Sequence, residues 1–116
     1  MEIAQTTADS LIVLTVNGRV DVNTAAQFEQ KLSEVLNQGT KQILIDCAGL
    51  EFISSAGLRT LLVAGKRLKA YHGVLVLSGL KQPIREAFDV SGFSSLFNIY
   101  DTAESAISAT TAVSNP

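Results

Sequence analysis

The stretch KQILIDCAGLEFISSAGLRTLL, residues 41–62, is the part of the sequence that decides the fold. Residues 41–46 form a short continuous apolar run, typical of a strand that is buried on both faces of a sheet. A second strand-like run, EFI at 51–53, leads to two adjacent serines, Ser54 and Ser55, and a helix is predicted over 54–73. Strands that alternate with helices in this way indicate an α/β sheet with right-handed crossovers.

The flanking segments continue this alternation. Residues 1–7 and 10–18 read as two strands of a hairpin, and a helix is predicted over 23–39, where Gly39 provides a stop. The apolar face of that helix comprises Ala25, Phe28, Leu32, Val35 and Leu36, and Thr24 with Gln27 has the form of a capping box. Downstream we expect a strand at 74–79, a helix at 81–92 with Pro83 in its first turn, a strand at 96–101 and a helix at 101–109.

The predicted fold is therefore α/β: a mixed sheet, opened by an antiparallel hairpin and continued by βα crossovers, with about four helices. One domain is expected over residues 1–109, followed by a flexible tail over 110–116, which is small and polar. A chain of 116 residues is long enough to bury a core.

The composition excludes several classes of function. A net charge of −2 and 6% aromatic residues argue against direct binding of nucleic acid. The apolar runs are too short to span a membrane, and no signal peptide is recognisable. The single cysteine rules out an internal disulfide and fits a reducing compartment, so we expect a cytoplasmic protein. The absence of a heptad pattern makes a monomer the default expectation.

Catalysis by the chain itself is disfavoured. The only histidine, His72, lies seventeen residues after Ser55 on the same predicted helix, about 25 Å away, so it cannot act as a base for that serine. Cys47 and His72 are too few to build a zinc site, and Cys47 reads as a small buried hydrophobe. The Gly65-Lys66 pair lies within a helix and lacks the pattern of a phosphate-binding loop. We therefore expect no enzyme activity, no metal and no cofactor.

Two carboxylates and the two serines follow predicted strands. If the strands that end near Asp21 and Asp46 are parallel neighbours, both carboxylates share one edge of the sheet with Ser54 and Ser55. The simpler interpretation makes Asp21 and Asp46 turn residues. A serine before a helix is a preferred N-cap. The unpaired N–H groups and the dipole at a helix start would also accommodate a phosphoryl group, which makes a charge switch possible there.

Three segments together resemble the anti-sigma factor antagonists, also called anti-anti-sigma factors, which are single-domain members of the STAS family. They are NGRVDVNTAAQFEQKL, ILIDCAGLEFISSAGLRTLL and VLVLSGLKQPIREAFDVSGFSSLFNIYDTAESAI. The resemblance implies a protein that binds a cognate anti-sigma factor, which is also a serine kinase of the GHKL type. Phosphorylation of one serine then abolishes binding, and a separate serine phosphatase restores it, so that transcription is regulated by partner switching.

Carried onto this sequence, the resemblance places the phosphorylated position at Ser55, with Ser54 as the second choice. Ser54 stands where many members have an aspartate, and Ala56 where many have a second hydroxyl. Asp21 matches an acidic position that orients the acceptor or contacts the partner. Gly57 is expected to let a partner backbone approach, and Arg59, Val63 and Lys66 to face outward. The expected partner-binding residues are Asp21, Ser54, Ala56, Gly57, Leu58, Arg59, Val63 and Lys66.

Two other functions stay open from the residues alone. A STAS domain can be a constitutive accessory subunit of a transporter complex, with both serines acting only as caps. A small nucleotide-binding enzyme is suggested only by the edge of the sheet and lacks both a phosphate-binding loop and a nearby base.

Overall fold

The computed structural model describes residues 1–114, with side chains as far as residue 111, and it contains a six-stranded sheet with helices on both faces. The strands are β1 Glu2–Ala8, β2 Leu11–Val20, β3 Gln42–Asp46, β4 Leu50–Ile53, β5 Val74–Ser78 and β6 Asn98–Tyr100. The helices are α1 Ala25–Asn37, α2 Ser55–Ala70, α3 Gln82–Val90 and α4 Ala103–Ser114, with a short 3₁₀ turn at Phe93–Ser95. The predicted fold class is confirmed.

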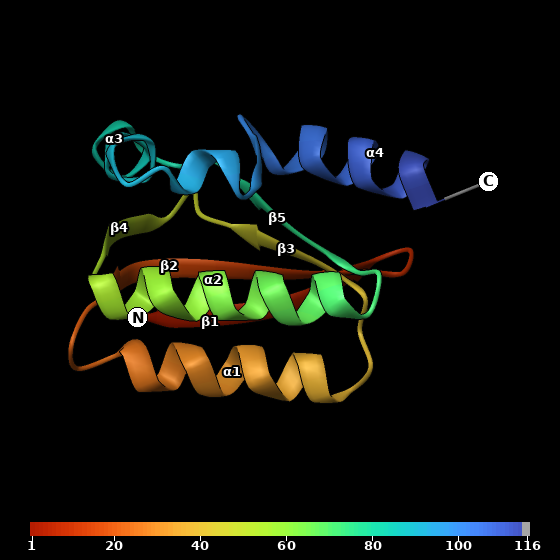
Figure 1. Ribbon diagram of the computed structural model, residues 1–116, viewed down its shortest axis with the longest axis horizontal. Coiled ribbons are helices and arrows are strands. Elements are labelled where there is room, and N and C mark those ends of the chain that lie inside the picture. Colours follow the sequence, from red (N-terminus) through yellow and green to blue (C-terminus); the bar gives the residue numbers. More distant parts are fainter. Residues whose placement is uncertain (115–116) are drawn as a thin grey trace.

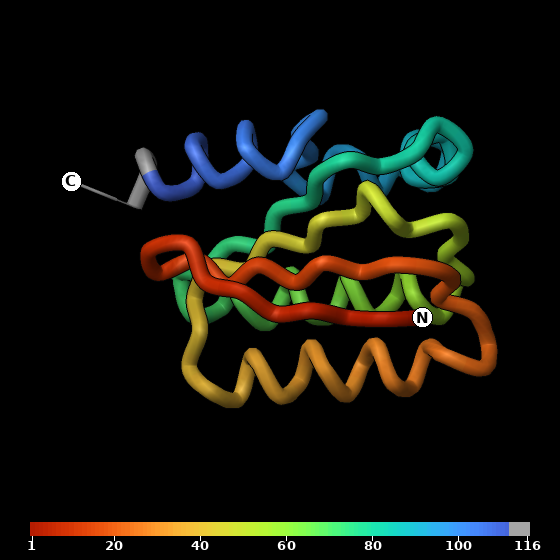
Figure 2. The backbone as a smooth tube through the Cα atoms, turned by 180° about the vertical axis from the view of Figure 1, so that it is seen from behind, coloured from red at the N-terminus to blue at the C-terminus, as the bar shows by residue number. Residues whose placement is uncertain are grey.

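The sheet has the order β1-β2-β3-β5-β6, and β4 pairs with β2 outside this path. β1 and β2 form the antiparallel hairpin expected from the sequence, while every other pairing is parallel. Because the chain crosses over through a helix between parallel strands, α1 and α2 come to lie together on one face. Figure 1 and Figure 2 show α1 and α4 on opposite sides of the sheet.

The sheet has one apolar cluster on each of its two faces. Alternate residues of a strand point to opposite faces, so Ile43 and Ile45 join the cluster under α1 and α2, whereas Leu44 joins the cluster under α4. The first cluster is the larger one and includes Phe28, Leu32 and Val35 of α1. The predicted apolar face of α1 is therefore confirmed.

Two helix starts differ from the sequence prediction. Thr24 precedes α1 but makes no side-chain cap; its hydroxyl accepts from the N–H of Asp21 (2.9 Å) and donates to the carbonyl of Arg19 (2.8 Å). The predicted capping box is therefore wrong, because the turn after β2 uses that hydroxyl. At α4 the sequence predicts Asp101 and Glu104 as a cap-like pair, but the Ser105 N–H donates instead to the Thr102 hydroxyl (3.1 Å).

The other predicted helix boundaries can also be compared with the structure. Gly39 follows the end of α1 with a φ of +82°, as expected for a helix stop, and Pro83 lies in the first turn of α3. α4 continues to Ser114, so residues 110–114, expected in the tail, extend the helix; residues 115–116 lie outside the described part. None of the helices described is both long enough and apolar enough to cross a membrane.

Candidate functional site

The start of α2 is held beside the end of β2 by strand β4. β4 pairs in parallel with the last residues of β2, with Val20 opposite Ile53, and the Ser54 N–H donates to the Val20 carbonyl at 2.7 Å. β3 pairs only with the first half of β2, so that Asp46 lies opposite Thr15. The serines therefore lie next to the turn that follows β2.

This pairing overturns one expectation. Asp21 and Asp46 do not share one edge of the sheet, because Asp21 comes six positions after Thr15, the partner of Asp46, which is about 20 Å of extended chain. Asp46 instead accepts a hydrogen bond from the Ala48 N–H at 3.1 Å and acts as a local turn residue. Only Asp21 lies near the serines.

Ser54 is the N-cap of α2. Its backbone is extended, with φ −80° and ψ 170°, and its Oγ accepts a hydrogen bond from the Gly57 N–H at 3.2 Å. The Ser54 carbonyl accepts from the Leu58 N–H at 2.9 Å and closes the first turn. Capping was also expected of Ser55, and that expectation is wrong, since Ser54 occupies the cap position.

Ser55 is the first residue of α2 and is exposed. Within residues 1–114 its hydroxyl has no hydrogen-bond partner, and the N–H groups of Ser55 and Ala56 are the two in the first turn that remain unpaired. A hydroxyl with this exposure is open to an incoming enzyme, and a phosphoryl group attached there would lie at the positive end of the helix dipole.

Asp21 is a residue of the turn between β2 and α1. One oxygen of its carboxylate accepts from the Asn23 N–H (3.0 Å) and the Thr24 hydroxyl (3.3 Å), and the other lies 3.8 Å from Nε of Arg19. It makes no hydrogen bond to Ser55 in the described part of the chain. The sequence predicted that Asp21 either orients the Ser55 hydroxyl or contacts the partner. Among the described residues the structure gives no hydrogen bond for the first role, and the second stays a prediction.

Gly57 lies in the core and not at the surface. A Cβ at this position would lie 2.6 Å from Cγ1 of Ile53 and 2.8 Å from Cγ1 of Val20. The glycine therefore lets α2 approach β2 and β4 closely, and the expectation that it admits a partner backbone is wrong. Leu58 is half-buried and packs against the same core.

The outward face of α2 is the one predicted from the sequence. Arg59, Val63 and Lys66 are exposed, and so is Ala56; Val63 keeps 51% of its surface accessible. The buried residues are Gly57, Leu61, Ala64 and Leu68, which follow helical spacing. From the sequence, the inward side of this helix is expected to comprise Leu58, Leu61, Leu62, Gly65 and Leu68. Leu58, Leu62 and Gly65 are only half-buried, and the buried Ala64 was not among those expected.

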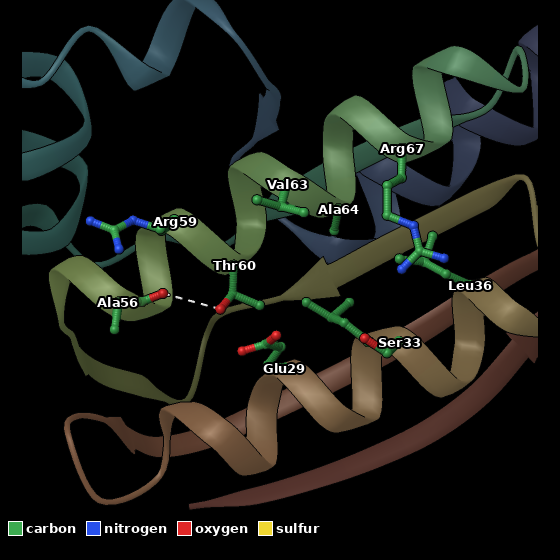
Figure 3. A pocket seen from close by; sticks show the side chains of 10 residues that line it. Glu29, Ser33, Leu36, Ala56, Arg59, Thr60, Val63, Ala64 and Arg67 are labelled. Carbon is green, nitrogen blue, oxygen red and sulfur yellow. Dashed lines mark hydrogen bonds between the residues drawn. The ribbon is translucent and has the colours of Figure 1, made fainter.

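An open groove of about 270 Å³ separates α1 from α2 beside this face. Its lining residues are Glu29, Leu32, Ser33 and Leu36 of α1 and Ala56, Arg59, Thr60, Val63, Ala64 and Arg67 of α2, as Figure 3 shows. The groove could not be predicted from the sequence, because no local pattern indicates that α1 packs beside α2. Val22, in the turn after β2, was missed as well; it is 87% exposed.

The two residues that suggested catalysis or metal binding lie away from this site. Cys47 is buried, and desolvation together with the Asp46 charge raises its pKa to about 12, so its thiol stays protonated. His72 is exposed beyond the C-terminal end of α2. Among the described residues, no three His, Cys, Asp or Glu side chains come together as metal ligands would.

Comparison with known proteins gives consistent results. The family model of the STAS domain matches residues 2–106. BtrV of Bordetella bronchiseptica, a protein with the provisional name of anti-sigma factor antagonist, is 35% identical over 109 residues, which cover 94% of each chain. Among solved structures, an anti-sigma factor antagonist from Mycobacterium paratuberculosis superposes with a TM-score of 0.86 at 25% identity, covering 93% of this chain and 92% of that one.

Two more distant structures share the fold. The anti-sigma factor antagonist SpoIIAA, solved in its unphosphorylated form, has a TM-score of 0.75 at 21% identity and covers 99% of this chain and 100% of its own. A sulfate transporter family protein from Wolinella succinogenes has a TM-score of 0.80 at 17% identity, covering 96% and 93%. The fold alone therefore does not distinguish a regulator from a transporter component.

Proposed function

The chain belongs to the STAS family of anti-sigma factor antagonists, and we propose that it binds a cognate anti-sigma factor until Ser55 is phosphorylated. The observation that carries the proposal is the difference between the two serines. The Ser54 hydroxyl is used by the helix cap, whereas the Ser55 hydroxyl is exposed and has no partner within residues 1–114.

The proposed partner is an anti-sigma factor that is also a serine kinase of the GHKL type, and a serine phosphatase removes the phosphate. The partner supplies the catalysis, so this chain is a binding module rather than an enzyme and acts in the cytoplasm. Support comes from the relatives, which are named as antagonists, and from SpoIIAA, which has been solved in both an unphosphorylated and a phosphorylated form.

The docking surface that we propose surrounds Ser55. Val22 lies in the turn next to the start of α2, and Val63 lies two turns along the helix; both are exposed apolar side chains. Arg59 and Lys66 complete the outward face of α2. A specific interface buries about 800 Å² on each partner, and a footprint of that size over Arg59 and Val63 also covers Ser55.

The phosphate acts through its charge. Phosphorylation adds a charge of about −1.5 to −2 at neutral pH, and burying an unpaired charge in an interface costs several kcal/mol. Since every 1.4 kcal/mol weakens binding tenfold, one phosphate raises Kd by roughly a hundredfold or more. The cap made by Ser54 stays intact, so the chain need not unfold.

Binding of the host's anti-sigma kinase to Ser55 variants tests this proposal. Ser55→Ala should keep the Kd of the unmodified chain, because no contact of the hydroxyl is lost, whereas Ser55→Asp should weaken binding by about tenfold or more. Ser10→Asp is the matched control, since Ser10 is an exposed serine near His72, at the opposite end of α2. Equal affinities of Ser55→Ala and Ser55→Asp would contradict the charge switch.

Mapping of phosphate on the chain isolated from its host tests the acceptor directly. Phosphate on Ser55 that changes with stress supports the proposal. Phosphate on Ser54 would contradict the choice of serine and would also require the helix cap to open. A chain that is unmodified under every condition would refute the switch and favour a constitutive accessory subunit.

A further inference from the structure

Helix α2 is strongly positive in a chain that is negative as a whole. It contains Arg59, Lys66, Arg67 and Lys69, which are four of the nine basic residues, and none of the eleven acidic ones. The helix therefore has a charge of +4. Five basic and eleven acidic residues remain elsewhere, which gives −6. The positive charge is concentrated on the element that begins with Ser55.

No ion pair neutralises these four cations in the described part of the chain. The ion pairs there join Arg19 to Asp21 and Arg85 to Asp89, both outside α2. Arg67 donates only to the neutral amide oxygen of Asn37, at 3.2 Å. Like charges on one helix repel, and Glu29 of α1, which lines the groove beside them, makes no ion pair with them within residues 1–114.

The helix dipole explains only part of this charge. Arg67 and Lys69 lie in the last turn of α2, where positive side chains stabilise the helix. Arg59 lies in the second turn and gains nothing from that effect. It also has no hydrogen-bond or ion-pair partner within residues 1–114 and is exposed. Its guanidinium is therefore available to a partner outside the chain.

The groove between α1 and α2 combines an apolar floor with two arginines, Arg59 and Arg67, in its lining. Leu32 and Ala64 are buried beneath it, and Val63 forms its exposed rim. Arg59 and Arg67 are eight residues apart, which is about 12 Å along a helix. Figure 3 shows Arg59 extended toward the first turn near Ala56, and Arg67 reaching toward α1.

We propose that α2 docks on an acidic surface of its protein partner. An apolar side chain of the partner occupies the groove beside Val63, and carboxylates on either side of it pair with Arg59 and Arg67. The occupant is a protein and not a nucleic acid, because the apolar floor of the groove and the exposed Val63 suit an apolar side chain and not a phosphate backbone. This inference rests on the proposed function and specifies the chemistry of the same docking surface.

The phosphate on Ser55 gains a second effect from this arrangement. Ser55 and Arg59 are four residues apart and therefore neighbours on one face of α2. A phosphoserine at position 55 pairs with the Arg59 guanidinium and withdraws it from the partner. It also places negative charge opposite the acidic surface, and like charges that face each other across an interface favour dissociation.

A photo-crosslinking amino acid, p-benzoyl-phenylalanine, in place of Val63 identifies the chemistry of the partner in the intact host. We expect the crosslinked peptide to come from the anti-sigma kinase and to contain several carboxylates around an apolar residue. The same amino acid in place of Val90, which is 88% exposed on α3, is the control and should not reach that peptide.

Other crosslinks from position 63 overturn the inference. A neutral or basic segment of the kinase would refute the acidic surface while leaving the proposed function intact. Crosslinks to a second copy of this chain or to nucleic acid would refute the choice of occupant. A kinase that binds normally but never crosslinks at position 63 would refute the docking face.

Charge reversal measures the same contact in solution with the purified kinase. Arg59→Glu should raise Kd at least tenfold at low salt, and Arg59→Gln should raise it less. Lys81→Glu makes the same charge change before α3 and should alter Kd less than threefold. Exchanging the crosslinked carboxylate for arginine should restore binding to Arg59→Glu. Equal effects of Arg59→Glu and Lys81→Glu on Kd would overturn the inference. If Ser55→Asp leaves Kd unchanged, that result contradicts only the proposed phosphorylation switch.

Discussion

Ser54 and Ser55 are neighbours in the chain, but their hydroxyl groups have different surroundings. Because the Ser54 Oγ accepts from the Gly57 N–H, Ser54→Ala should lower the free energy of unfolding by about 0.5–2 kcal/mol. Ser55→Ala removes no hydrogen bond and should change it by less than about 0.5 kcal/mol. Urea denaturation of the two variants measures both values. A loss for Ser55→Ala as large as that for Ser54→Ala would contradict the assignment of the cap.

Cys47 makes the stability of the protein depend on alkaline pH. Its pKa is raised from 9.0 to about 12 on folding, chiefly because burial desolvates the thiolate. Below pH 9 the thiol is protonated in both states, so its contribution to stability is fully present there. Between pH 9 and 12 only the unfolded thiol ionises, and stability falls by about 1.4 kcal/mol per pH unit. Denaturation of the native chain and of Cys47→Ala at pH 8 and pH 10 should show this loss in the native chain alone.

Some properties of single residues follow from the sequence and others do not. The exposure of Arg59, Val63 and Lys66 follows from helical spacing, since the leucines fix the inward side. The identity of the N-cap residue does not follow from the sequence, because both serines have a side chain that can cap a helix. Ser54 takes the role because it follows β4 directly and keeps an extended backbone. Gly57 was misread because the sequence does not reveal how close β2 and β4 lie.

At the scale of the helix, phosphorylation of Ser55 should stabilise α2. The phosphate lies at the positive end of the helix dipole and one turn from Arg59, so the free energy of unfolding should rise by about 0.3–2 kcal/mol. Thermal denaturation of the phosphorylated and unmodified chains measures the gain. Arg59→Gln should reduce the gain, whereas Lys66→Gln, farther along the helix, should leave it unchanged. A phosphorylated chain with a lower Tm would contradict the intact cap.

The strands could be predicted only in part. The apolar runs at 41–46 and 74–79 correspond to β3 and β5, because strands buried on both faces read as continuous apolar sequences. The pairing of β4 with β2 could not be predicted. β2 is long enough to pair with β3 along its first half and with β4 along its end, and nothing local in the sequence marks that division.

At the scale of the whole molecule, α4 covers the face of the sheet opposite the candidate site. Ala106 is fully buried there with Leu44 and Val76. Ala106→Asp would bury an unpaired charge and should lower the free energy of unfolding by about 3 kcal/mol or more. Ser108→Asp, exposed on the same helix, is the control and should cost about 0.5 kcal/mol or less. Chemical denaturation that gives equal values for the two variants would contradict the packing of α4.

The fold class and the order of the elements could be predicted from the sequence, because the alternation of strands and helices limits the topology. The groove between α1 and α2 could not be predicted, since it depends on the side chains that two distant segments present to each other. For the same reason the exposed Val22 was missed: its proximity to the start of α2 follows from the pairing of Val20 with Ile53.

The cap formed by Ser54 has a consequence for timing. On the proposed function, the hydrogen bond from the Gly57 N–H to the Ser54 Oγ is present whether or not Ser55 carries a phosphate. No slow rearrangement of the chain then separates modification from response. If Ser55 is the switch, the phosphate is a covalent mark on a helix start that keeps its cap, and the rate of the phosphatase then sets how long the mark lasts.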